Sequence, residues 1–469
     1  MPEFVAGHLG RGTVRSQKRA THAEEHQWLM KKSEREYSNK VFAIFAVAAL
    51  IAFAFFNLSA KYLQQSVAAA VQPAWMAPFV VSLAAIAVGP FINRNWWETN
   101  YALVSYGLGL IIVVYYIFVL SNPGRLILTM YEYVSFISLI GSLFVVTGGI
   151  HIHVRGKATP WENIAYLGTG AILANVLGTT GASMVLIRPY LRANSYRAQG
   201  YHVVFFIFLV SNIGGVLTPV GDPPLFLGYL KGVPFFWIFS HVNEIWILAV
   251  GLVLLIFLLI DGYFYRRQPA RVQQVAAKLD EPQIQGVHNI FFLLLILGSV
   301  FIERPFLLRE MIMWASALGS YYTTKRYIHQ NNEFSFQPIK EVAILFAGIF
   351  ATMIPALDWL ALNSTKLGLV TPAHYFWGSG LLSSVLDNAP TYLNFLSAAF
   401  GIHGANINNP SHVQIMLGLL TPASQWYTNP LGPGAMAIGP ETWKYIQAVS
   451  VGAVFFGAMT YIGNGPISW

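Results

Sequence analysis

The sequence predicts an all-α polytopic membrane protein with inverted structural repeats, two re-entrant hairpins and two broken transmembrane helices. Its 469 residues are 55% hydrophobic and only 10% charged, whereas soluble proteins average roughly 25% charged residues. The apolar runs are about twenty residues long and do not alternate with period two, which favours helices over a β-barrel. The absence of Cys excludes disulfides and thiolate metal sites.

The N-terminal half is predicted to contain a tail, a leading helix and the first repeat. Residues 1–40 are polar and form a cytosolic tail without the apolar core of a signal peptide. Residues 41–264 hold the leading helix and the first repeat. The spans and interrupted segments expected there are 41–60, 74–93, 101–121, 130–151, a hairpin at 164–191, a broken helix at 201–224, and 242–264.

The C-terminal half, residues 287–469, follows a cytosolic linker at 265–286 and repeats this layout. Its expected segments are 287–302, 306–322, 339–358, a hairpin at 372–400 and a broken helix at 443–466. The counterpart of span 242–264 would follow Pro466, so either the second repeat lacks its final helix or the chain is truncated. Glu132 and Glu244 lie at the ends of their spans and are expected to be solvated.

Two similar motifs interrupt the helices. Gly215–Pro224 and Gly457–Pro466 align without a gap, and share Gly, Thr, Gly and Pro at matching positions. Each ends an apolar run with residues that cannot continue a helix. A polar interruption precedes each motif, at 178–183 and at 387–391. Interrupted hydrophobic segments at matching places in two halves indicate the binding site of a secondary transporter.

The distribution of basic residues predicts the topology. With the tail inside, most Lys and Arg residues between the spans fall on the cytosolic side, as the positive-inside rule requires. This holds only if both interrupted segments enter and leave on the same side. The net charge of +8 is therefore explained by the basic residues on the cytosolic side of the membrane. It does not indicate binding of nucleic acid, which is not an expected partner. We expect a multi-pass protein of the inner (plasma) membrane with a cytoplasmic N-terminus.

Irregular backbone is tolerated inside a bilayer only where protein or a water-filled cavity satisfies its polar groups. We therefore expect the hairpin tips and helix breaks to meet near mid-membrane as two half-sites, the first tip facing the first break and the second tip the second. The first half-site is predicted to comprise Asn175, Thr179, Thr180, Ser183, Asn212, Thr218 and Asp222. The second is predicted to comprise Ser384, Asp387, Asn388, Thr391, Thr460 and Asn464.

Each half-site contains one carboxylate, Asp222 or Asp387, among hydroxyl and amide groups. Such oxygen ligands suit hard cations such as sodium, the metal ion expected at both Asp residues. A buried carboxyl group without a partner has a raised pKa, and a bound cation lowers it again. Competition between proton and cation at these residues predicts sodium (or lithium)/proton exchange. As alternative readings, both Asp residues precede Pro-containing helix starts and suit helix N-caps.

The motifs also resemble those of a known family. Ser211–Gly215 followed by Thr218–Asp222 resembles the signature of NhaD-type sodium/proton antiporters. Gly178–Ser183 and Leu386–Thr391 are similar to the hairpin-tip motifs of the wider ion-transporter superfamily, which includes arsenite permeases and sodium-coupled citrate and dicarboxylate carriers. The resemblance implies a scaffold, frequently dimeric, and a mobile transport domain that contains both hairpins and moves in an elevator-like way.

Two other functions remain open from the sequence. The first is a sodium- or proton-coupled carrier of an anion such as citrate, a dicarboxylate or arsenite, held by positive helix ends and polar side chains. The second is a membrane scaffold or receptor without transport activity, which leaves the duplicated breaks unexplained. The sequence contains no phosphate loop, nucleophile triad or cofactor motif, so neither an enzyme nor an ATP-driven pump is expected. No cofactor is expected besides the sodium ion, and the expected partners are a small cation, the proton, the lipid bilayer and a second copy of the chain.

Overall fold

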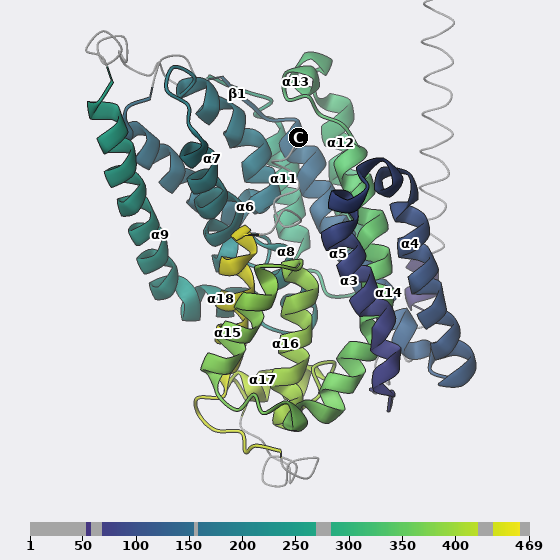
Figure 1. Cartoon of the computed structure of the whole chain (residues 1–469). Coiled ribbons are helices and arrows are strands. Elements are labelled where there is room, and N and C mark those ends of the chain that lie inside the picture. Colours follow the sequence, from purple (N-terminus) through teal and green to yellow (C-terminus); the bar gives the residue numbers. More distant parts are fainter. Residues whose placement is uncertain (1–52, 58–67, 154–157, 269–282, 421–434, 460–469) are drawn as a thin grey trace, which may run out of the picture. The chain divides into compact units, whose positions relative to one another are not determined.

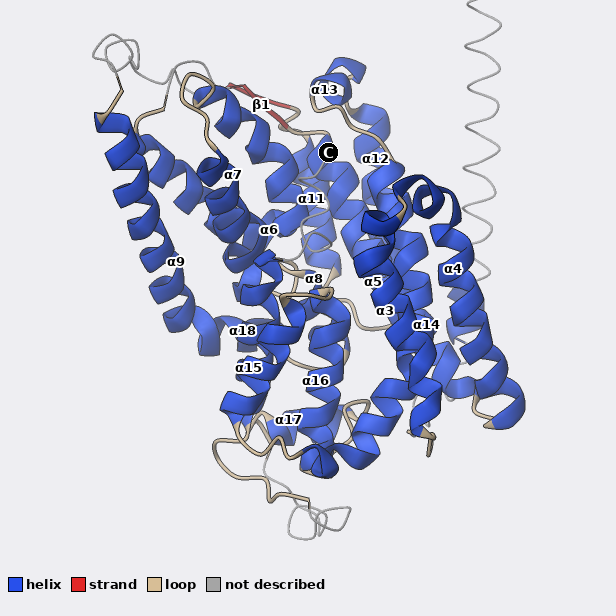
Figure 2. Ribbon diagram, viewed as in Figure 1, coloured by secondary structure: helices blue, strands red, loops and turns tan. Residues whose placement is uncertain are grey.

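A computed structural model describes residues 53–57, 68–153, 158–268, 283–420 and 435–459. Residues 53–57 are helical and belong to a separate unit, Met1–Ser59, while the rest belong to Ala60–Trp469. Of the residues described, 78% are helical and almost none lie in a sheet (Figures 1 and 2). The prediction of an all-α polytopic membrane protein is therefore confirmed.

Seven helical segments among the described residues are long and apolar enough to cross a membrane. Short 3₁₀ or π turns extend several of the regular helices, as at Tyr115–Val119 after α4. The α-helices in these segments are α3 (Ala77–Ile92), α4 (Arg94–Val114), α5 (Pro123–Gly148), α6 (Pro160–Ala193), α7 (Gly200–Phe206), α9 (Phe235–Arg266) and α14 (Gln337–Asn363).

Shorter elements connect these segments. Strands β1 (His151–His153) and β2 (Gln283–Gln285) pair antiparallel, with Ile152 opposite Ile284. The shorter helices are α8 (Pro223–Leu230), α11 (Asn289–Ser299), α12 (Leu308–Thr323), α13 (Arg326–Asn331), α15 (Pro372–Ser383), α16 (Asn388–Ile402), α17 (Pro410–Met416) and α18 (Trp443–Phe456).

Helix α6, which we call the first hairpin, folds back on itself at Gly178. This residue has φ 73° and ψ 154°, a conformation that suits glycine because it lacks a Cβ atom. The Tyr166 hydroxyl on one arm donates a hydrogen bond of 2.9 Å to the carbonyl of Leu186 on the other. Asn163 and Asn194 exchange amide hydrogen bonds at the base. The 34-residue helix therefore forms two antiparallel arms and not one straight span.

Helices α15 and α16 form the second hairpin. Asp387 caps α16, because its Oδ1 accepts a hydrogen bond of 2.8 Å from the Ala389 N–H. The Tyr375 hydroxyl of α15 donates to the Ala398 carbonyl of α16 at 3.2 Å. In Figure 1 the base of the first hairpin lies towards β1 and that of the second towards α17, so the two tips point towards each other.

The segment after α7 is the first break, which we define as Ile213–Asp222. It follows a π turn, Ile207–Asn212, and contains a 3₁₀ turn, Ile213–Leu217, and an extended stretch before α8 begins. A Cβ atom on Gly221 would lie only 2.1 Å from the Gly215 carbonyl oxygen. The backbone of residue 221 can therefore approach that of residue 215 this closely only because residue 221 is glycine. The second break begins at Gly457, where α18 gives way to a 3₁₀ turn, Gly457–Met459; the remainder lies outside the described residues.

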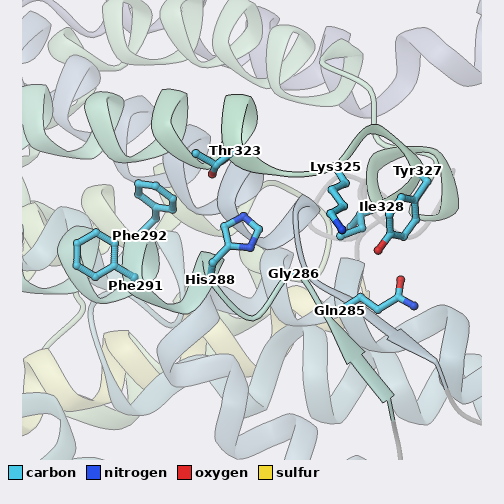
Figure 3. Close-up of a pocket in the computed structure, with 9 residues that line it drawn as sticks. All are labelled: Gln285, Gly286, His288, Phe291, Phe292, Thr323, Lys325, Tyr327 and Ile328. Atoms are coloured by element: carbon cyan, nitrogen blue, oxygen red, sulfur yellow. The ribbon is translucent and has the colours of Figure 1, made fainter.

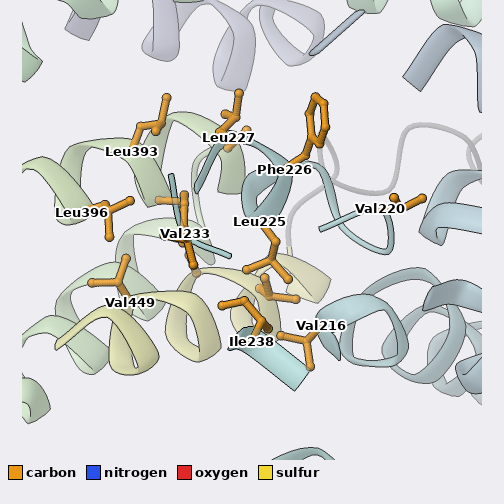
Figure 4. Close-up of a cluster of buried hydrophobic side chains, with 14 of the residues drawn as sticks. Val216, Val220, Leu225, Phe226, Leu227, Val233, Ile238, Leu393, Leu396 and Val449 are labelled. Atoms are coloured by element: carbon orange, nitrogen blue, oxygen red, sulfur yellow. The ribbon is translucent and has the colours of Figure 1, made fainter. Parts of the chain in front are cut away.

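The hairpins and breaks share one hydrophobic core. Val216 of the first break, Leu225 of α8, Ile238 of α9, Leu393 of α16 and Val449 of α18 are all buried in a single cluster (Figure 4). Side chains from both halves of the chain are thus interleaved. We call α6–α9 and α15–α18 the hairpin body, and α3–α5 with α11–α14 the helical frame.

The helical frame has a reciprocal packing pattern. Helix α4 packs against α14, and α12 packs against α5, so the second helix of each half contacts the third helix of the other. A buried ion pair links α5 to α14, since Arg125 Nε lies 2.8 Å from Asp358 Oδ1. The Tyr116 hydroxyl donates to the other oxygen of Asp358 at 2.9 Å. This exchange of neighbours is what two repeats of one helical layout would produce.

Candidate functional site

The carboxylate of Asp222 lies where the two hairpin tips meet. Thr179 Oγ1 of the first tip is 3.5 Å from Asp222 Oδ1, and Asn388 Nδ2 of the second tip is 3.3 Å from Oδ2. The backbone N–H of Thr179 also donates to the Gly221 carbonyl at 2.8 Å. Asp222, Thr179 and Asn388 are all buried. The first tip thus faces the first break, as expected, but the second tip contacts the first break too.

Asn175 fixes the first break to the first hairpin. Its amide N–H donates to the Gly214 carbonyl at 2.7 Å, and its Oδ1 accepts from the Leu217 N–H at 2.9 Å. The Thr218 hydroxyl donates to the Asn175 carbonyl at 2.6 Å and accepts from the Gly221 N–H at 3.0 Å. The side chains of Asn175 and Thr218 therefore position the break, since they form hydrogen bonds with backbone groups that the interrupted helix leaves unpaired.

Ser183 and Asn212 extend the polar site. Ser183 Oγ donates to the Thr179 carbonyl at 2.6 Å and lies 2.8 Å from Ser211 Oγ. A Cβ atom placed on Gly457 would be 3.3 Å from Asn212 Oδ1 and 3.2 Å from Asn388 Nδ2. The start of the second break therefore lies between the amides of Asn212 and Asn388, and a larger side chain at Gly457 would crowd both.

Asp387, the second predicted carboxylate, is buried and serves as the N-cap of α16. Thr391 Oγ1 donates to the Asp387 carbonyl at 2.8 Å, which further orders the first turn of this helix. Asn388, which directly follows Asp387, reaches the Asp222 carboxylate, so the two acids lie on adjoining parts of the site. In the part of the chain that the structure describes, no Lys, Arg or His forms an ion pair with either residue.

The structure does not bring every predicted residue to this point. Ser384 is only partly buried and its hydroxyl donates to the Leu381 carbonyl of its own helix. Thr180 lines a cavity of about 20 Å³ between the first tip and Leu139 and Leu143 of α5, enough for about one water molecule. Thr460 and Asn464 lie outside the described residues.

One charged pair elsewhere in the bundle was not anticipated. Glu132, expected to be solvated, is buried, and its Oε1 lies 2.5 Å from Lys231 Nζ, which also contacts Asn408 Oδ1 at 2.6 Å. The expectation for Glu132 was therefore wrong, because a Lys from another part of the chain reaches it. Glu132 belongs to the frame and Lys231 directly follows α8, so this pair joins the frame to the hairpin body. An ionisable residue within an apolar span is the sequence signal for such a pair.

Comparison with known proteins gives one family. Residues 66–468 match the model of the CitMHS_2 family, which is described as "Putative citrate transport". No curated protein matches the chain. The more specific resemblance to NhaD-type antiporters stays a prediction. Because the match extends over most of the chain and the fold has the spans of a polytopic protein, the chain belongs to this citrate transport family and is a multi-pass membrane transporter.

Proposed function

We propose that this transporter carries citrate or a related carboxylate anion, driven by a coupled sodium ion or proton. The description of its family supports the anion. The contact of both hairpin tips with the buried Asp222 carboxylate supports the coupling cation, and this is the observation on which the proposal depends. A buried carboxylate without a cationic side chain needs a proton or a metal ion to offset its charge.

The cation would occupy the space beside Asp222, with oxygen ligands from both halves of the chain. Thr179 Oγ1, Asn388 Oδ1 and carbonyl groups of the first break are hard donors that suit sodium. An anion placed near two carboxylates would be repelled unless a cation lay between them. Binding of the anion would then depend on prior binding of the cation, and this dependence is the coupling that symport requires.

The hairpin body supports an elevator-like movement. Residues of the first break, α8, α9, α16 and α18 are buried in one cluster, which also includes residues of the frame such as Phe136 of α5. In such a movement the contacts within the body would be kept, and those between the body and the frame would change. The Glu132–Lys231 pair joins this body to the frame and would have to separate in such a movement. We propose further that the protein resides in the inner (plasma) membrane with its N-terminus in the cytoplasm, in keeping with the distribution of Lys and Arg.

Sodium (or lithium)/proton antiport is the second candidate. It is supported by the same site, since Asp222 and Asp387 contribute two carboxylates and the described residues around them contribute no cationic side chain. A site that holds either protons or a sodium ion could exchange them without an organic anion. The two candidates therefore differ in whether citrate is required.

Transport by the purified protein in sealed vesicles separates the candidates. For the proposed symport, uptake of labelled citrate should rise when an inward sodium or proton gradient is imposed and fall when the gradient is collapsed. For antiport, an outward sodium gradient should acidify the lumen without citrate, because each sodium ion that leaves is exchanged for entering protons. Cation exchange at full rate without any carboxylate, combined with no citrate uptake, would refute the symport proposal.

A further inference from the structure

A cavity among the described residues lies away from the hairpin tips. Its volume is about 710 Å³, and none of the predicted site residues lines it. It lies between the segment that joins β2 to α11 and the segment that joins α12 to α13. The residues around it are Gln285, Gly286, His288, Phe291, Phe292, Thr323, Lys325, Tyr327 and Ile328.

The cavity has a polar end and an apolar end. Figure 3 shows Phe291 and Phe292 at one end, and Lys325, Tyr327 and Gln285 at the other. Phe291 is 61% exposed and projects from α11, an apolar helix. The polar end is formed where α12 ends and α13 begins, beyond the apolar span. This layout matches a phospholipid, whose acyl chains contact hydrocarbon while its phosphate lies at the membrane surface.

The polar end offers groups that suit a phosphate and a hydroxyl. Lys325 is exposed and forms no ion pair with an acid anywhere in the described chain. Gln285 Oε1 is buried and has no hydrogen-bond partner among the described residues. A lysine ammonium binds phosphate, and an unpaired buried acceptor favours a ligand that brings a donor. The hydroxyl groups of a glycerol headgroup are such donors.

The walls of the cavity are held rigidly. The Asn289 side chain, at the start of α11, donates to the Gly149 carbonyl at 2.8 Å and to Thr324 Oγ1 at 2.9 Å, and accepts from Ser320 Oγ at 2.6 Å. These bonds fix α11 to the ends of α5 and α12. A Cβ on Gly319 would lie 2.6 Å from the Phe292 ring, so Phe292 packs directly against the backbone of α12. A preformed site loses little entropy on binding.

We propose that this cavity binds an anionic phospholipid with a glycerol headgroup, of the phosphatidylglycerol class. Its phosphate contacts Lys325, a headgroup hydroxyl donates to Gln285 Oε1, and an acyl chain lies along Phe291. The lipid therefore joins α11 to α13 on the helical frame and stabilises the folded transporter. This inference is independent of the transported substrate, since none of the residues that line the cavity belongs to a hairpin tip.

The test measures the melting temperature of the full chain in detergent with added lipid. Dioleoyl phosphatidylglycerol should raise the Tm of the wild type by about 2 °C or more, because a ligand of the folded state stabilises it. Phosphatidylcholine with the same chains and water-soluble glycerol 3-phosphate should each give less than half of this rise. A Tm rise of equal size with either of them, or no rise with phosphatidylglycerol, would overturn the proposal.

Variants locate the effect in the cavity. Lys325→Gln should lose at least half of the Tm rise and retain less phosphatidylglycerol in native mass spectrometry, whereas Lys325→Arg should restore both. Lys340→Gln is the matched control, because Lys340 is an exposed lysine at the start of α14, outside the cavity. Lys325 is exposed, so its loss should leave the lipid-free Tm unchanged. An undiminished response of Lys325→Gln, or an equal loss in Lys340→Gln, would place the lipid elsewhere.

Discussion

The two hairpins meet at one carboxylate, although their tips are built from different residues. The first hairpin turns at Gly178, whose φ is positive, and its tip carries no acid. The second turns through Ser384–Leu386 without a positive φ, and Asp387 begins its returning helix. The Asp222 carboxylate accepts hydrogen bonds from Thr179 of the first tip and Asn388 of the second. The Asp387 carboxylate accepts a hydrogen bond from the Ala389 N–H of its own helix. The two acids thus lie in unequal positions in the two halves of the chain.

This difference in position suggests that Asp222 and Asp387 have different roles. Asp222 joins the two hairpins, so its charge state is coupled to the contact between their tips. Asp387 sets the start of α16, where its Oδ1 accepts from the Ala389 N–H. A fully symmetric pair of acids would give two equivalent cation sites. The observed arrangement favours one shared site in which Asp222 is central and Asp387 is auxiliary.

Replacement of Asp222 with Asn should give the largest loss of function. The change removes the charge that we propose for the coupling ion, and such charge-assisted contacts contribute about 1.5–3 kcal/mol. Cation-driven citrate uptake in vesicles should therefore fall by about 10- to 100-fold. Glu244→Gln is the control, because Glu244 is an exposed acid on α9 and should transport normally. Full cation-driven uptake by Asp222→Asn would remove Asp222 from the mechanism.

Two substitutions of Asp387 separate its charge from its role as an N-cap. Asparagine is as good an N-cap as aspartate, whereas loss of a cap to alanine costs about 1 kcal/mol. Asp387→Asn should thus keep the melting temperature of the wild type and reduce uptake by about tenfold or less. Asp387→Ala should reduce uptake and also lower the melting temperature. Equal uptake by Asp387→Asn and the wild type would show that Asp387 acts through the cap alone.

The helix interruptions could be predicted from the sequence, because each depends on residues that are neighbours in the chain. Gly178 in an apolar run, Asp222 before two prolines and Asp387 before Pro390 are short-range signals of interrupted helices. The contact of Asn388 with Asp222 could not be predicted in the same way, since it depends on how the two hairpins pack. The Glu132–Lys231 pair was missed for the same reason. Each residue alone is compatible with the end of a span, and only the packed structure buries both.

Replacement of Gly178 with Ala should affect stability at the first tip more than equivalent changes at the second. The φ of 73° and ψ of 154° at Gly178 form a conformation that is nearly restricted to glycine and costs a residue with a side chain about 1–3 kcal/mol. The added Cβ would lie 3.3 Å from the Val220 carbonyl oxygen. The melting temperature should fall, while Ser384→Ala at the second tip should change it little. Gly168→Ala is the control within the same hairpin, because its Cβ would meet only Leu254 at 3.7 Å. An unchanged melting temperature for Gly178→Ala would mean that the tip relaxes without cost.

Asn388→Ala and Thr179→Val test how much each hairpin contributes to the shared carboxylate, and should have the smallest effects. Asn388 lies 3.3 Å and Thr179 3.5 Å from the oxygens of Asp222, and neutral hydrogen bonds contribute about 0.5–1.5 kcal/mol. We expect uptake to fall about fivefold for Asn388→Ala and about twofold for Thr179→Val. Because both act through Asp222, each should have no further effect when combined with Asp222→Asn. Additive losses in these double variants would mean that the tips bind substrate independently of Asp222, and the case for a single shared site would then fail.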